Sequence, residues 1–135
     1  MNGKLVNACL GVGTAFLAAC ASNDTSAVKP ERGPDGTIAY FVDVETSDPG
    51  SRIEANNEDV GKSPMQLKIY GDKDGSFHNF GSYNYTVRAY PVKQGQFIQT
   101  KVFHTGGFFT GEDKIPKRIY FDLNAPSSAI EVNAR

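Results

Sequence analysis

The chain has 135 residues, 39% of them hydrophobic, with 14 basic and 15 acidic side chains and two cysteines. This near-neutral balance, without a block of like charges, excludes the electrostatic footprint of a nucleic-acid-binding protein. Removal of residues 1–19, which have the pattern of a signal, leaves 116 residues with a net charge of −2. That length is sufficient for one domain with one hydrophobic core.

The first 19 residues have the pattern of a secretory signal peptide. Lys4 supplies the positive charge, residues 5–16 are mostly apolar or small, and Ala18-Ala19 are the small residues expected at a cleavage site. The apolar run is shorter than the roughly 20 residues that a membrane-spanning helix needs. Two interpretations are open, a removable signal and a short core helix, and we favour the signal because polar residues follow at once.

The signal ends in Leu17-Ala18-Ala19-Cys20, which resembles the lipobox of bacterial lipoprotein precursors. The resemblance implies cleavage before Cys20, a diacylglyceryl thioether on its sulfur and an acyl chain such as palmitate on its new amino group. Several acyl chains anchor a protein stably, whereas one holds it only marginally. Ala21 stands where aspartate often marks inner-membrane retention, so we expect the outer membrane, at its periplasmic face or the cell surface.

Cysteine usage agrees with this expectation. Cys9 lies inside the signal and would be removed, and Cys20 would be capped by lipid. The mature chain would then have no disulfide. Residues 20–36 are rich in polar residues, Pro and Gly, and predict a flexible tether of roughly 20–25 Å average reach. Membrane contact is expected to come from the lipid rather than from a basic face.

From residue 38 the hydrophobic period becomes two, which indicates half-buried strands. Six short strands are predicted, and no helix. They cover residues 38–45, 53–55, 67–69, 85–89, 97–104 and 118–123. In the strand 97–104, Ile98 and Val102 are expected on the inner face. The segment 57–64 reads as a turn. We therefore predict a small antiparallel, immunoglobulin-like all-β sandwich of about six to seven strands over residues 37–125. Residues 126–135 form a tail in which 129–132 are a candidate edge strand.

The segment 42–90 resembles a PEGA domain, a small extracytoplasmic β module. Asp48-Pro49-Gly50-Ser51 occupies the turn that names the family, although only Gly50 matches its consensus. Gly61-Lys62-Ser63-Pro64 matches the second turn, and Tyr85-Thr86-Val87 the strand that follows. The resemblance implies an interaction or structural module without enzymatic machinery.

The sequence contains no catalytic or metal-binding signature. His78 and His104 lack close metal-ligand spacing. The segment Asp72-Lys73-Asp74-Gly75 resembles the start of a calcium loop but lacks its later ligands, so we predict a β-turn there. We expect no catalytic residue, no metal and no cofactor.

Two long connections carry most of the remaining aromatic residues. If six successive strands alternate in direction, these connections share one end of the sandwich, opposite the end where the tether arrives. That end would carry Phe77, His78, Phe80, Phe108 and Phe109. These rings either plug the open end of the core or form a binding surface for an envelope protein or a glycan. The absence of tryptophan makes a surface for carbohydrate stacking the weaker of the binding interpretations.

Three functions follow from these patterns. The first is a lipid-anchored β-sandwich that binds an envelope component through its distal loops. The second is a small envelope hydrolase that uses His78 or His104 with a carboxylate. The third is a structural accessory to a larger complex, whose long loops are dispensable.

Overall fold

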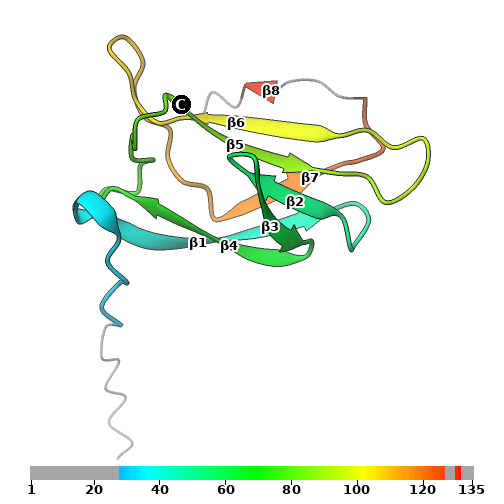
Figure 1. Cartoon of the computed structure of the whole chain (residues 1–135), viewed down its shortest axis with the longest axis horizontal. Coiled ribbons are helices and arrows are strands. Elements are labelled where there is room, and N and C mark those ends of the chain that lie inside the picture. Colours follow the sequence, from blue (N-terminus) through cyan, green and yellow to red (C-terminus); the bar gives the residue numbers. More distant parts are fainter. Residues whose placement is uncertain (1–27, 127–129, 132–135) are drawn as a thin grey trace, which may run out of the picture.

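The computed structural model describes residues 28–126 and 130–131, which form a two-layer β-sandwich (Figure 1). One sheet has the strand order β4-β1-β7 and the other β3-β2-β5-β6-β8. The strands are β1 (Ile38–Thr46), β2 (Arg52–Ala55), β3 (Glu58–Lys62), β4 (Met65–Gly71), β5 (Asn84–Ala89), β6 (Gln99–His104), β7 (Arg118–Phe121) and β8 (Ile130–Glu131), preceded by a 3-10 turn, η1 (Pro34–Gly36). The predicted all-β sandwich is confirmed.

The core lies between the two sheets and follows the alternation seen in the sequence. In β1, Val42 and Val44 are fully buried while Phe41 and Asp43 are exposed. The same period places one face of each strand inward. The buried hydrophobic residues are Val42, Val44, Ile53, Ala55, Leu67, Ile69, Phe77, Val87, Ala89, Phe103, Ile119, Phe121 and Leu123. No helix in the described ranges has the length and hydropathy needed to cross a membrane.

Two of the strand pairs are parallel, whereas the sequence predicted an antiparallel sandwich. β7 pairs in parallel with β1, through a register that includes Val44 and Ile119. β8 pairs in parallel with β6 and forms the edge strand expected near residue 130. Both parallel pairs follow from long connections that bring the chain back to a strand running in the same direction.

The predicted turn over 57–64 is wrong, because Glu58–Lys62 forms β3. Asn56 and Asn57 have positive φ values of 49° and 68° and make the two-residue hairpin turn between β2 and β3. β3 is an edge strand with a mostly charged sequence, which hides the alternating pattern. The extra strand reverses the direction of every later strand. As a result β4 ends beside the start of β1, where Gly71 pairs with Ile38.

The inner face of β6 is also opposite to the prediction. Ile98 precedes the strand and is exposed, as is Phe97, whereas Gln99 and Phe103 are buried. Lys101 shares the phase of these buried residues, and its Nζ lies 5.3 Å from the centre of the Phe121 ring. Burial lowers the pKa of Lys101. A long lysine stem can cover apolar surface in this way, so the hydrophobic pattern of β6 misleads.

The end of the predicted tether is attached to the sandwich. The Glu31 carbonyl accepts a hydrogen bond from the Ala39 amide at 2.8 Å. Its carboxylate accepts hydrogen bonds from Lys68 Nζ at 2.9 Å and the Tyr70 hydroxyl at 2.7 Å, and these partners lower the pKa of Glu31. The domain therefore begins by residue 31 rather than 37. Cys20 and the predicted signal peptide lie outside the described residues.

Candidate functional site

The two long connections meet at one end of the sandwich, which we call the aromatic end (residues 72–83 and 105–117). The Phe77 amide donates to the Asp113 carbonyl at 3.0 Å, and the Ile115 amide donates to the Gly75 carbonyl at 2.8 Å. The predicted meeting of the loops is thus confirmed. Their predicted position is wrong, because the aromatic end is where the chain enters β1 and not the opposite end (Figure 1). The missed strand β3 explains the reversal.

The phenylalanine and tyrosine side chains of this end divide into one buried ring and four exposed ones. Phe77 is 1% exposed and stacks on Phe103 at 5.0 Å between ring centres, so it plugs the core as one interpretation predicted. Phe80 is 51% exposed, and Phe108 and Phe109 are each 95% exposed. Together with Tyr83, which the sequence reading missed, they form an apolar surface on two loops.

The Phe108–Phe109 segment stands on a tight turn that hydrogen bonds hold in place. Gly106 has a φ of +93°, and the Gly107 amide donates to the Thr110 carbonyl at 2.9 Å. The Asn79 side chain donates to the Gly106 carbonyl at 2.8 Å, which ties the two loops together. Such a short turn presents both rings outward, with 5.3 Å between their centres.

Asp113 fixes the base of this loop. Its side chain is buried, and its carboxylate accepts the His104 amide at 2.7 Å while its own amide donates to the His104 carbonyl at 2.9 Å. Its carbonyl is the acceptor for Phe77. One residue therefore connects β6 to both loops, and a buried carboxylate with such backbone partners orders the loop around it. In the sequence, Glu112 and Asp113 are adjacent acidic residues of a predicted loop, and nothing in that pair indicates this role for Asp113.

His78 lies between two carboxylates beside the loops. Its Nδ1 is 2.8 Å from Asp72 Oδ1, its Nε2 is 4.0 Å from Asp35 Oδ2, and its ring packs on Phe80 at 4.5 Å. A small cavity of about 180 Å³ adjoins it, lined by Phe77, Phe80, Ser82, Tyr85 and Thr105 among others. Both ring nitrogens face acidic groups, so His78 joins the η1 segment to the loop that follows β4.

His104 has a different environment, since its Nδ1 is 3.2 Å from the side-chain oxygen of Asn84. The predicted turn at Asp72–Gly75 is confirmed, because the Gly75 amide donates to the Asp72 carbonyl at 3.0 Å. Within residues 28–126, no group of three or more His, Cys, Asp or Glu side chains is arranged to hold a metal ion.

A basic hollow lies beside η1 at the same end. It has a volume of about 470 Å³ and is lined by Lys29, Arg32 and Lys73, together with Pro30, Gly33, Gly36 and Ile38. These three cations come from the predicted tether and from a turn more than forty residues later, so the sequence shows no basic cluster. None of them forms an ion pair with another residue of the described part of the chain.

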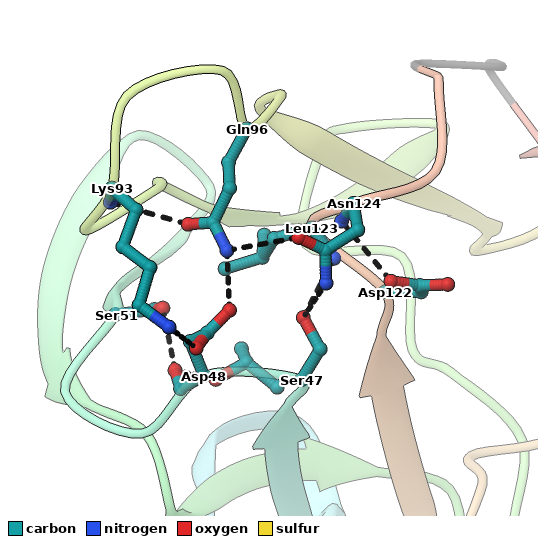
Figure 2. Close-up of polar contacts among 9 residues, drawn as sticks. Ser47, Asp48, Ser51, Lys93, Gln96, Asp122, Leu123 and Asn124 are labelled. Carbon is teal, nitrogen blue, oxygen red and sulfur yellow. Dashed lines mark hydrogen bonds and ion pairs between the residues drawn. The ribbon is translucent and has the colours of Figure 1, made fainter.

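The opposite end of the sandwich is polar and tightly connected (Figure 2). We call it the polar end; it consists of residues 47–51, 91–98 and 122–126. Asp48 accepts hydrogen bonds from Lys93 and Gln96, and Gln96 also donates to Asn124 Oδ1 at 3.2 Å. The Ser47 hydroxyl accepts the Leu123 amide at 3.0 Å. Lys93 and then Gln96 lower the pKa of Asp48.

Both turns of the PEGA-like pattern lie at the polar end. Pro49 and Gly50 connect β1 to β2, and Gly50 has a φ of +92°. The Gly50 amide donates to the Ser63 carbonyl at 2.7 Å, which joins this turn to the second one. In that second turn, Gly61 lies in β3 and Pro64 follows the strand. These residues make a structural corner and expose no large apolar side chain.

Compared with protein families, with curated proteins and with solved structures, the chain has no significant match. The functional interpretation therefore depends on the residues and their arrangement.

Proposed function

We propose that this chain is a non-catalytic, lipid-anchored protein of the bacterial envelope, whose β-sandwich binds another envelope component through its aromatic end. The observation that carries the proposal is the exposure of Phe80, Phe108 and Phe109 on two adjoining loops. A contiguous exposed apolar surface on loops of a rigid scaffold is typical of an interaction site.

The way the loops are held supports binding. Asp113 and Asn79 connect them through hydrogen bonds at 2.7–3.0 Å. Phe77 packs beneath them in the core. A surface ordered before it meets its partner loses less conformational freedom on binding, so its affinity is higher.

The anchor rests on the lipobox-like stretch ending in Cys20 and on the signal that precedes it. Cleavage and acylation there would leave a chain held by several acyl chains, which is a stable attachment. The PEGA-like turns support an extracytoplasmic module. We place the protein at the outer membrane because Ala21 follows the cysteine.

Mass spectrometry of the protein from its native membrane tests the anchor. We expect a mature chain that begins at Cys20 and carries three acyl chains, and a Cys20→Ser variant that keeps its signal and remains unacylated. A full-length chain without acyl groups contradicts the proposal.

Photo-crosslinking in intact cells tests the binding surface. A crosslinking amino acid at position 80, 108 or 109 is expected to capture an envelope component, whereas one at position 41 is not. Phe41 is a matched control because it is 55% exposed on β1, away from the aromatic end. Equal capture at all positions argues against a specific surface. Deletion of residues 106–111 without effect favours the structural-accessory alternative.

A second candidate function is a small hydrolase, favoured by the 2.8 Å contact between His78 and Asp72 beside a cavity of about 180 Å³. A carboxylate that orients a histidine is a common arrangement for a general base. The second nitrogen of His78, however, faces Asp35 rather than open space. His78→Ala and Asp72→Asn variants with an unchanged phenotype would remove this candidate.

A further inference from the structure

The position at which the chain enters the sandwich determines which end faces a membrane. The first described residue, Val28, lies eight residues after Cys20, and the backbone of Arg32 already pairs with Ile38 at the aromatic end. Eight residues span at most about 28 Å when fully extended. If Cys20 carries the lipid of the proposed function, on which this inference rests, Val28 lies within that distance of the bilayer surface. Arg32, at the aromatic end, is twelve residues after Cys20 and so lies within about 43 Å of it.

The loop that protrudes from this end has the composition of a membrane-interface segment. Residues 105–111 read Thr-Gly-Gly-Phe-Phe-Thr-Gly and contain no ionisable side chain. Phe108 and Phe109 are 95% exposed, so water surrounds two large rings that no part of the described chain covers. Aromatic side chains partition favourably into the interfacial region of a bilayer.

The basic hollow supplies the second attraction. Lys29, Arg32 and Lys73 line it beside η1. The coil of η1 and the protruding loop between β6 and β7 both lie at the left of Figure 1. Among the nearby carboxylates, Asp74 pairs with Lys114 at 3.1 Å. Asp72 and Asp35 face His78, which balances their charge only when it is protonated. Glu112 is exposed in the loop and opposes the cations. Basic side chains near an anionic bilayer each add attraction, and guanidinium groups bind phosphate well.

We infer that the aromatic end docks on an anionic phospholipid bilayer, with Phe108 and Phe109 in its interfacial region and Lys29, Arg32 and Lys73 against its phosphate headgroups. The lipid on Cys20 makes this docking intramolecular, so weak contacts are sufficient. The sandwich then stands on the membrane in one orientation, with its polar end facing away from the bilayer.

Single-tryptophan fluorescence tests the docking, because the native chain has no tryptophan. A Phe109→Trp variant and a matched Phe97→Trp variant are purified in the mature form and reconstituted into phosphatidylglycerol–phosphatidylcholine vesicles with brominated acyl chains. Phe97 is exposed at the polar end, and neither position is in the core. We expect the indole at 109 to shift to the blue and to be quenched at least twofold more than the indole at 97.

Equal quenching at the two positions, or stronger quenching at 97, overturns the inference. Shielding of the indole at 109 in native envelopes but not in pure lipid vesicles also overturns it, and assigns the surface to a protein or glycan. Mass spectrometry of the same samples reports acylation. A chain without acyl groups contradicts the proposed function, whereas an acylated chain that does not dock contradicts only this inference.

A Lys29→Gln, Arg32→Gln, Lys73→Gln variant in the Phe109→Trp background tests the headgroup contacts. All three side chains are exposed, so the fold is expected to persist, which circular dichroism checks. Each cation removed should lower the docking equilibrium about fivefold in anionic vesicles. In vesicles of phosphatidylcholine alone, the substitution should have no effect. An unchanged response in anionic vesicles excludes the basic hollow from docking.

Discussion

The two ends of the sandwich differ in how their side chains are used. At the polar end, Gln96 donates a hydrogen bond to Asp48, and the Ser47 hydroxyl accepts one from a backbone amide of the 122–126 loop. These polar side chains are therefore paired within the molecule (Figure 2). At the aromatic end, the polar groups of Asp113 and Asn79 order the loops from beneath, while Phe108 and Phe109 remain uncovered. The polar end also exposes apolar side chains, but Phe97 and Ile98 are each 45% exposed, whereas Phe108 and Phe109 are each 95% exposed.

An exposed phenylalanine pair adds little to folding and raises the risk of aggregation, so its presence on an ordered loop is consistent with the proposed binding role. The buried Phe77 on a neighbouring loop shows that the same residue type at the same end can serve the core.

The largest expected effect separates the two kinds of phenylalanine. Phe77→Ala should lower the free energy of unfolding by about 3–5 kcal/mol, because it leaves a cavity beside Phe103 and Tyr85. Phe109→Ala should change it by about 0.5 kcal/mol or less, since the ring is exposed. Urea denaturation measures both. Similar losses would mean that the protruding loop packs on the domain.

A glycine pair tests how closely the loops approach the sheet. A Cβ at Gly71 would collide with Ile115 Cδ1 and with the Ser76 carbonyl, so Gly71→Ala should cost about 1–3 kcal/mol of unfolding free energy. Gly111 has open space around it, and Gly111→Ala should be nearly neutral. Thermal denaturation compares them. A neutral Gly71→Ala would show that the loop can shift away from β4.

Tyr85, in β5 beside the aromatic end, predicts a loss of stability in alkali. Burial, and then the nearby Glu58 charge, raise the pKa of Tyr85 to about 12. A phenol with a raised pKa contributes stability that is present below its unfolded pKa of about 10 and is lost as the pH rises towards 12. Tyr85→Phe should flatten this decline in the stability–pH curve. An identical slope in the variant would contradict the assignment.

At the polar end, Asp48→Ala should loosen the 91–98 loop without unfolding the domain. The substitution removes the acceptor for Lys93 and Gln96, so amide hydrogen exchange in residues 92–97 should accelerate several-fold. Asp122→Ala is the control, because that carboxylate accepts only the local Asn124 amide at 3.0 Å. Equal acceleration in the two variants would indicate that the connections between loops are unimportant.

The smallest effect is expected from Asp74 at the aromatic end. Hydrogen bonds from Ser76, through its side chain and its backbone, together with Lys114, lower the pKa of Asp74 to about 2. A depressed pKa adds stability above the unfolded value of about 3.9, and this part is lost as the pH falls towards 2. Asp74→Asn should reduce the acid slope slightly in pH titrations followed by circular dichroism. A steeper slope in the variant would contradict the expected sign.

Much of the sandwich is predictable because several of its strands, such as β1 and β7, alternate strictly between buried and exposed residues. Val42 and Val44, or Ile119 and Phe121, are buried where a period of two places them. β3 is not predictable in this way, since an edge strand needs little apolar surface and Glu58–Lys62 is mostly charged. Because β3 is missed, the sequence predicts the aromatic end at the wrong end of the sandwich, although the residues predicted to lie there are correct.

The candidate site is predictable only in part. The phenylalanines of both loops stand out in the sequence, but the division between buried Phe77 and exposed Phe108 depends on packing. In the sequence, Asp113, Arg32 and Lys73 look like ordinary loop residues. Their roles appear only when the fold places each of them beside residues from distant segments. Contacts between distant segments leave no trace in a local pattern.

The parallel pairing of β1 with β7 has a consequence for how the protein is made. β1 lies at the centre of its sheet, yet one of its two neighbours is formed by residues 118–121, near the end of the described domain. During synthesis, one edge of β1 must stay open until residues 118–121 have emerged. Closure of such a distant pair is intrinsically slow, and the intermediate with the open strand edge is the species most exposed to aggregation.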